Sequence, residues 1–85
     1  MNETCVDCLS PLLDFPGLAG DIITGVQTDE EAIEIICEIL ENGDRTVQQV
    51  YETIFRSAFT SGIDPATAEN LSNSIRECLN MLSGA

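Results

Sequence analysis

The 85-residue sequence predicts an all-α fold, a single compact bundle of four to five short helices held together by two disulfide bonds. Three observations support this prediction. Apolar residues recur every three or four positions through most of the chain, helix-capping motifs separate these stretches, and four cysteines occur in a short sequence. A chain of this size is near the lower limit for one hydrophobic core, where covalent crosslinks add needed stability. Residues 1–85 are therefore expected to form one helical domain.

The opening segment is expected to be helical but kinked or irregular. Thr4 could cap a helix that has Asp7 at its third position. However, Pro11 lacks the backbone donor that a continuous helix requires there. Alternatively, Ser10-Pro11 is itself the start of a helix. A Phe-Pro-Gly turn at 15–17 ends the segment, and a short amphipathic helix is expected after it, based on a spacing of four between apolar residues: Leu18, Ile22 and Val26.

The third helical segment has the clearest boundaries. Thr28 and Glu31 form a capping box, and the acidic first turn suits the positive end of the helix dipole. Asn42-Gly43 is a typical left-handed stop signal. Because this helix is apolar over a wide arc, we expect it to be buried centrally, in preference to presenting an exposed binding face.

Similar signals mark the last two helices. Thr46 and Gln49 form a second capping box, and the helix that they start is expected to run to about residue 60. Asp64-Pro65 begins the final helix, with Asp64 as the cap and Pro65 as its first residue. Gly84 is expected to close it.

Charge is distributed unevenly along the chain. Residues 1–44 contain eleven acidic residues and no basic one, whereas residues 45–85 contain four acidic residues and three arginines, which gives a net charge of −12. Three basic side chains are too few for nucleic-acid binding, which depends on displacing counterions from phosphates. The same charge disfavours anionic membranes at neutral pH, unless the carboxylates are protonated. No apolar run is long enough for a transmembrane segment, and no signal peptide is visible, so a secreted protein would be represented here by its mature form.

The four cysteines are interpreted as structural disulfides. Cys5 and Cys8 are three residues apart, so a helix would place both on one face, while Cys37 and Cys78 lie in later apolar stripes. Four cysteines allow three pairings, and the sequence does not select one. The preferred pairing is nested, Cys5–Cys78 with Cys8–Cys37, which closes loops of about 74 and 30 residues worth roughly 4.5 and 3.5 kcal/mol by chain entropy. The crossed pairing is the second choice. Oxidised cysteines favour a secreted, extracellular location.

Catalytic, cofactor and metal sites are not expected. A redox Cys-x-x-Cys motif belongs at a helix start after a strand, and no strand precedes Cys5. A four-thiolate zinc site draws its ligands from two close pairs, whereas Cys37 and Cys78 are single. Histidine is absent, no nucleophile elbow occurs, and Asn42-Gly43-Asp44 lacks the surrounding oxygens of an EF-hand. The protein is therefore expected not to be an enzyme.

The chain resembles the saposin-like family in its layout. The resemblance is carried by Cys5-Val6-Asp7-Cys8 in the first helix, by Cys37 in a later helix and by Cys78 near the end. It implies a small helical protein that binds lipids or perturbs membranes. The family pattern has six cysteines, and polar residues around Gln48 and Ser72 occupy the positions where the other two would fall.

A second resemblance is to the acidic helical terminal domains of spider silk proteins. It rests on residues 54–62, which read Ile-Phe-Arg-Ser-Ala-Phe-Thr-Ser-Gly, and on the uneven charge. This resemblance implies self-association that depends on pH. The chain has no silk repeats and more cysteines than that comparison favours.

Two functions remain from different classes. The first is a binding module in which amphipathic helices accept a lipid, another apolar ligand or a protein partner. Its candidate wall residues are apolar or aromatic: Leu12, Leu13, Phe15, Ile35, Ile39, Tyr51, Phe55 and Phe59. The default interpretation of all eight is an ordinary core position.

The second function is a structural module that self-assembles, so a homo-oligomer is left open. Lowering the pH towards the carboxylate range would reduce repulsion and promote association. The candidate pH-sensing acids lie in the third helix: Glu30, Glu34, Glu38 and Glu41. No partner can be named from the sequence.

Overall fold

The computed structural model describes residues 2–83, with side chains described from residue 4 to residue 82. The elements in order are α1 (Asn2–Leu9), the 3-10 helix η1 (Ser10–Asp14), α2 (Leu18–Ile22), α3 (Asp29–Asn42), α4 (Val47–Thr60) and α5 (Pro65–Ser83). The described residues contain no strand. The predicted all-α fold with two disulfides is confirmed.

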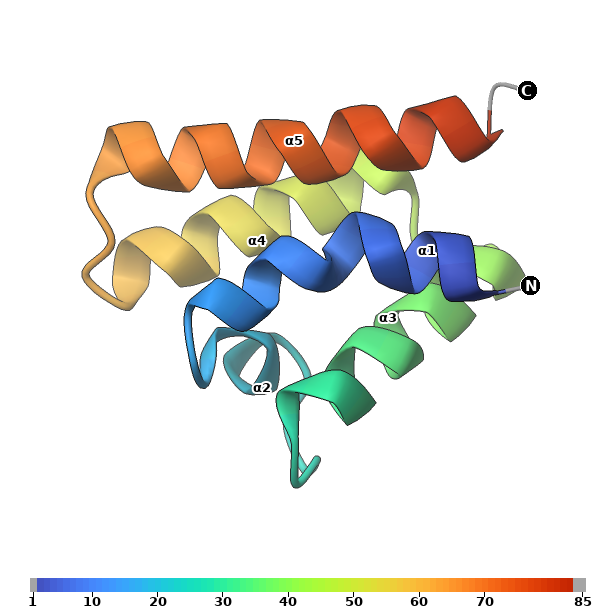
Figure 1. Cartoon of the computed structure of the whole chain (residues 1–85), viewed down its shortest axis with the longest axis horizontal. Helices are drawn as coiled ribbons and strands as arrows, with labels where there is room; N and C mark the ends of the chain where they lie inside the picture. Colours follow the sequence, from blue (N-terminus) through green and yellow to red (C-terminus); the bar gives the residue numbers. More distant parts are fainter. Residues whose placement is uncertain (1, 84–85) are drawn as a thin grey trace.

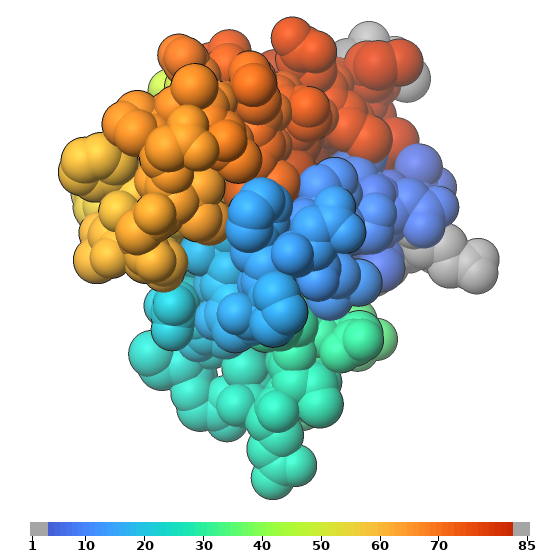
Figure 2. All heavy atoms as spheres, turned by 60° about the vertical axis from the view of Figure 1, so that its left-hand side comes forward, coloured from blue at the N-terminus to red at the C-terminus, as the bar shows by residue number. Residues whose placement is uncertain are grey.

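The helices form two pairs on opposite sides of α1, α4 with α5 and α2 with α3 (Figure 1). The most extensive contact is between α4 and α5, which run antiparallel and are joined by a short turn. Helix α1 lies between α5 on one side and α3 on the other, and α2 fills the space between α3 and α4. Figure 2 shows the face where the end of α4 and the start of α5 meet η1 and α2.

The opening segment is irregular, as predicted, and the structure decides between its alternatives. Helix α1 begins at Asn2, so Thr4 lies inside it and does not cap it. At Ser10 the backbone tightens from α to 3-10, and Pro11 lies in the first turn of η1, where no donor is needed. The hydroxyl of Ser10 donates to the carbonyl oxygen of Asp7 at 2.8 Å.

The short second helix is correctly predicted at its start but not at its end. The chain turns at Gly17, which adopts a left-handed φ of 88°, and α2 then runs only from Leu18 to Ile22. Ile23 is extended and Gly25 has a positive φ. The helical spacing therefore failed at Val26, which lies beyond α2 but still packs half-buried against the core.

The predicted N-cap residues are confirmed for the three longer helices, but the predicted capping box of α3 forms only in half. The Thr28 hydroxyl accepts from the backbone N–H of Glu31, but the Glu31 carboxylate accepts from Gln27 and not from Thr28. At α4 both halves of the capping box form. The C-terminal end of α3 is closed by Gly43 in the left-handed region.

At the start of α5, the Asp64 carboxylate caps the helix by accepting two hydrogen bonds from Thr67, one from its backbone N–H at 3.1 Å and one from its hydroxyl at 2.6 Å. These bonds, the hydroxyl one above all, lower the pKa of Asp64 from its ordinary value of 3.8. The predicted closure at Gly84 lies outside the described residues.

The core is aliphatic and has contributions from every element. Its largest fully buried apolar side chains are Leu9, Leu12, Ile33, Ile54 and Ile75. The predicted central burial of α3 was wrong, because the helix lies at the edge of the molecule and packs mainly on α1, η1 and α2 (Figure 1). It buries one face only: Ile33 and Ile36 are buried, while Ile35 and Ile39 are half-buried. The one buried polar side chain among the described residues is Ser72, whose hydroxyl donates to the Ala68 carbonyl at 2.7 Å.

The preferred disulfide pairing was wrong. The bonds are crossed: Cys5 pairs with Cys37 of α3, and Cys8 pairs with Cys78 of α5, with Cα–Cα distances of 6.0 and 5.5 Å. Their sequence separations of 32 and 70 residues are so close to those of the nested pairing that the two differ by less than about 0.1 kcal/mol in chain entropy. Chain entropy therefore could not select a pairing. The position of α1 between α3 and α5 selects it, because Cys5 faces one neighbour and Cys8 the other.

Candidate functional site: the aromatic stripe of α4

The eight candidate wall residues do not enclose one cavity. Leu12 is completely buried in the core, Leu13 is exposed, and Ile35 is half-buried on α3. Phe15 lines an open hollow between η1, α2 and the α4–α5 turn, and Ile39 lines a separate pocket. The structure brings only the three from α4 together: Tyr51, Phe55 and Phe59.

These three side chains, which we call the aromatic stripe, follow from the periodicity of α4. They are four residues apart, so they lie one above another along the helix. Each directly follows a residue of the buried stripe, which consists of Val50, Ile54 and Ala58. A step of one residue turns about 100° around a helix. The aromatic stripe is therefore placed on the flank of α4, beside the core and partly in solvent.

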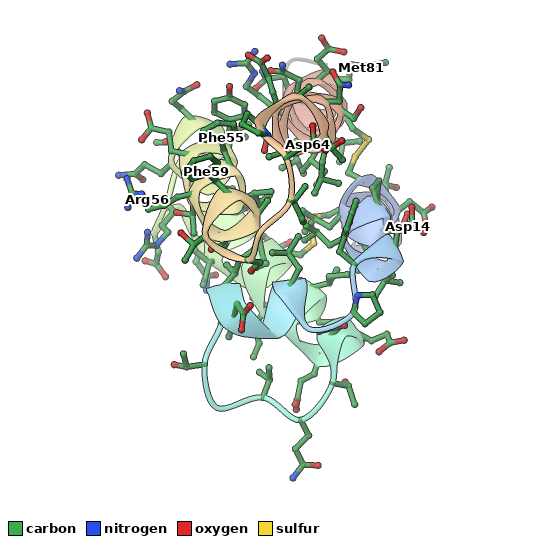
Figure 3. All side chains as sticks on the ribbon, turned by 90° about the vertical axis from the view of Figure 1, so that its left-hand side faces the viewer. Asp14, Phe55, Arg56, Phe59, Asp64 and Met81 are labelled. Atoms are coloured by element: carbon green, nitrogen blue, oxygen red, sulfur yellow. A yellow bond between two sulfur atoms is a disulfide. The ribbon has the colours of Figure 1, made fainter. Side chains whose placement is uncertain are left out.

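Exposure increases along the aromatic stripe towards the end of α4. Tyr51 and Phe55 are half-buried, and Phe59 is 56% exposed. The rings of Phe55 and Phe59 are stacked, with centroids 6.4 Å apart and planes 12° from parallel. Figure 3 places both on the α4 side of the molecule, away from Asp14 of η1. The open end of the stripe is thus a flat aromatic surface.

The other end of the aromatic stripe is anchored on α5. The Arg76 guanidinium lies 4.3 Å from the centroid of the Tyr51 ring, and it donates to the side-chain oxygen of Asn73 at 2.8 Å. A cation above an aromatic face is attracted by the negative face of the ring. This contact holds the Tyr51 ring in place, so the stripe is ordered at one end before any partner binds.

Two opposite charges border the aromatic stripe. Glu52 and Arg56 line the same shallow hollow as the three rings. Glu52 accepts a hydrogen bond from the side-chain amide of Gln48 at 3.3 Å, whereas Arg56, an exposed residue, forms no ion pair or hydrogen bond with the described residues. They are the only charged residues of α4, which therefore has no net charge.

A second apolar concavity lies between α2, α3 and α4. Its volume is about 130 Å³. Pockets that enclose drug-sized ligands are about 300–1,000 Å³, so this one has room for only a few carbon atoms. It is lined mainly by aliphatic side chains, with an arginine and a threonine: Ile22, Ile23, Ile36, Ile39, Arg45, Val50 and Thr53.

The four candidate pH-sensing acids are all exposed along α3: Glu30, Glu34, Glu38 and Glu41. None of them forms an ion pair with a described side chain. Their control of association stays a prediction. Within residues 4–82, no group of three or more His, Cys, Asp or Glu side chains is arranged to hold a metal ion.

Sequence reasoning identified the rings of the site but missed its polar members. Glu52 and Arg56 were detectable, because Glu52 lies three residues before Phe55 and Arg56 three residues before Phe59, and residues three apart on a helix are neighbours. Arg76 was not, since its contact with Tyr51 depends on how α5 packs on α4.

Neither a family model nor a solved structure matches the chain. Within the described part, no helix combines the length and hydrophobicity needed to cross a membrane. The two disulfides are consistent with an oxidising environment.

Proposed function

We propose that this chain is a small secreted, non-catalytic binding module that binds an apolar segment of a protein partner on the aromatic stripe. One observation carries the proposal. Three of the four aromatic residues of the protein lie on one flank of α4, while no aromatic ring is among the buried core residues. Aromatic side chains and arginine are enriched at protein interfaces, where they supply much of the binding energy.

A protein partner fits this surface better than a lipid. Among the described residues, three large apolar residues are exposed outside α4. Leu13 belongs to η1, Met81 and Leu82 belong to the last turn of α5, and Met81 lies away from Phe59 (Figure 3). The pocket between α2, α3 and α4, at about 130 Å³, is too small for an acyl chain. The hollow that Phe15 lines is larger, at about 370 Å³, but it is open to solvent and is bordered by the acidic residues Asp14 and Asp21. The net charge of −12 also opposes anionic membranes.

The test is a titration with an uncharged amphipathic helical peptide, which carries leucine and phenylalanine at positions i, i+4 and i+7. Binding is followed by backbone amide NMR at low protein concentration. We expect shifts concentrated on α4 and the facing part of α5, and their loss in Phe59→Ser. Met81→Ser is the matched control, because Met81 is a large apolar residue that is 76% exposed but lies outside the stripe.

Two results would refute the proposal. One is the absence of shifts on α4 at millimolar peptide. The other is equal loss of binding in both serine variants, which would indicate non-specific apolar contact. A parallel titration with neutral phosphatidylcholine vesicles tests whether the stripe binds lipid instead. Shifts on α4 with vesicles but not with peptide would indicate that the ligand is a lipid and not a protein.

The pocket between α2, α3 and α4 supports a second candidate function, the binding of a small aliphatic carboxylate. Its aliphatic lining suits a short alkyl chain, and Arg45, which has no ion pair or hydrogen bond with the described residues, is available at the same pocket for the carboxylate. Titration with hexanoate should shift the methyl signals of Ile23 and Ile39, and Arg45→Gln should weaken the effect. Equal shifts with hexanol, which has no carboxylate, would show that Arg45 does not contribute to binding.

A further inference from the structure

We infer that the protein partner of the aromatic stripe is a second copy of this chain, bound by antiparallel pairing of the two α4 helices about a two-fold axis. The inference rests on the proposed function and deepens it by naming the partner. It follows from the charge of α4, the order of its two charges, and the spacing of its three rings.

Electrostatic repulsion between two copies is lowest at α4. The chain has a net charge of −12, and α3 alone carries six acidic residues and no basic one. Each of the helices other than α4, η1 included, has an excess of acidic residues, whereas α4 has one of each sign. Like-charged surfaces placed face to face cost several kcal/mol and exclude partners. A neutral surface on an acidic protein is the place where two identical molecules meet at the lowest cost.

The order of the two charges on α4 makes the surface complementary to itself. Glu52 and Arg56 are four residues apart, about 6 Å along the helix axis. In a two-fold antiparallel pair with its axis level with Ile54, Glu52 of each copy is level with Arg56 of the other. Two opposite-charge pairs form at once, as a two-fold interface requires. The Arg56 guanidinium, which has no ion pair or hydrogen bond with the described residues of its own chain, gains a partner.

The same axis interleaves the aromatic rings. With a rise of about 1.5 Å per residue, Tyr51, Phe55 and Phe59 lie about 4.5 Å before, 1.5 Å after and 7.5 Å after the level of Ile54. The two-fold axis reverses these offsets for the second copy, so its Tyr51, Phe55 and Phe59 lie about 4.5 Å after, 1.5 Å before and 7.5 Å before the same level. Every ring is then about 3 Å, measured along the axis, from the nearest ring of the other copy. Tyr51 of the second copy then lies beside the exposed face of Phe59, and every ring has a neighbouring ring from the other copy.

The experiment compares four chains by sedimentation equilibrium between about 5 and 500 µM: the natural sequence, Glu52→Arg, Arg56→Glu and the exchanged double variant Glu52→Arg/Arg56→Glu. We expect a monomer–dimer equilibrium for the natural chain. Each single variant should weaken it about tenfold, because like charges then face each other twice. The double variant should return to within about threefold of the natural chain, since the pairs are restored with their signs exchanged.

Glu52→Arg separates local pairing from overall charge. It reduces the magnitude of the net charge, from −12 to −10, so repulsion between whole molecules decreases, yet we expect weaker dimers. An equimolar mixture of Glu52→Arg and Arg56→Glu should form heterodimers more tightly than either variant forms homodimers. Phe59→Ser should also abolish the dimer, whereas Met81→Ser should leave it unchanged. All these side chains are exposed, and far-UV circular dichroism of each variant confirms that it is folded.

A natural chain that stays monomeric at 500 µM would refute the inference. So would a dimer that is indifferent to both single charge variants, because its interface would lie elsewhere. If the chain is monomeric but the uncharged peptide still shifts α4, the proposed function stands and only the identity of the partner is wrong. If neither the peptide nor a second copy engages α4, both proposals fail.

Discussion

Removal of each disulfide tests the crossed pairing and the account of stability together. The Cys8–Cys78 bond joins residues 70 apart, and the Cys5–Cys37 bond joins residues 32 apart. Chain entropy gives about 4.4 kcal/mol for the first bond and about 3.7 kcal/mol for the second. A domain of this length has about 4–13 kcal/mol of total stability. Loss of either bond should therefore leave a marginally folded protein, and loss of Cys8–Cys78 should be the more severe.

The two double variants, Cys8→Ala/Cys78→Ala and Cys5→Ala/Cys37→Ala, are matched controls for each other. Each removes one buried sulfur, at Cys8 or Cys37, and one half-buried sulfur. The packing losses are thus similar, and the difference between the two variants in free energy of unfolding reports the different lengths of the loops that the disulfides close. Urea unfolding followed by circular dichroism should place Cys8→Ala/Cys78→Ala about 0.7 kcal/mol below the other variant. The reverse order, or a cost under about 1 kcal/mol for either, would refute the reasoning.

The pairing itself can be read from a digest without reduction. Cleavage before aspartate separates Cys5 from Cys8, because Asp7 lies between them, and trypsin cleaves after Arg76. The crossed pairing predicts that peptide 1–6 is linked to 29–43 and that 7–13 is linked to 77–85. A linked pair of 1–6 and 77–85 would restore the nested arrangement instead.

Three substitutions away from the sulfurs follow from local structure, each measured by urea unfolding. Ile54→Ala empties a completely buried position and should cost about 2–5 kcal/mol; a cost below 1 kcal/mol would contradict its central place. Gly43→Ala should cost about 1 kcal/mol from backbone strain alone, because φ is 79° and no atom lies within 4 Å of the added carbon. Asp64→Ala should destabilise the protein at pH 7 and progressively less below about pH 4. The hydrogen bond from the Thr67 hydroxyl lowers the pKa of Asp64 below 3.8, so the stabilisation is complete above that value and disappears as the pH falls through the lowered pKa. A pH-independent difference would contradict this assignment.

Association should respond to salt if the aromatic stripe joins two copies. Each copy carries −12, and ions at about 0.5 M screen charges beyond a few ångströms. Sedimentation at about 0.05 and 0.5 M NaCl should show tighter dimers at the higher concentration. Weaker dimers at high salt would mean that the two Glu52–Arg56 pairs outweigh the overall repulsion.

Helix boundaries were predictable because they depend on residues close in sequence. Thr28, Thr46 and Asp64 cap helices by bonding backbone groups three residues away, and Gly43 ends α3 through its own φ. The prediction failed at Val26, since periodicity alone does not register that the chain becomes extended at Ile23. The candidate wall residues were drawn from real apolar stripes, but periodicity alone does not tell which stripe meets the core and which flank stays open.

The helices, their caps, the net charge and the four cysteines available for crosslinking follow from the sequence alone, because each depends on composition or on neighbours within about four positions. Long-range packing sets the other features: Cys5 bonds Cys37 and Cys8 bonds Cys78, Arg76 covers Tyr51, and Phe59 remains in solvent. Those outcomes depend on the position of α1 between α3 and α5 and on the rotation of α4 against α5. Both come from packing between segments up to 70 residues apart, and loop entropies that differ by less than about 0.1 kcal/mol leave the choice to that packing.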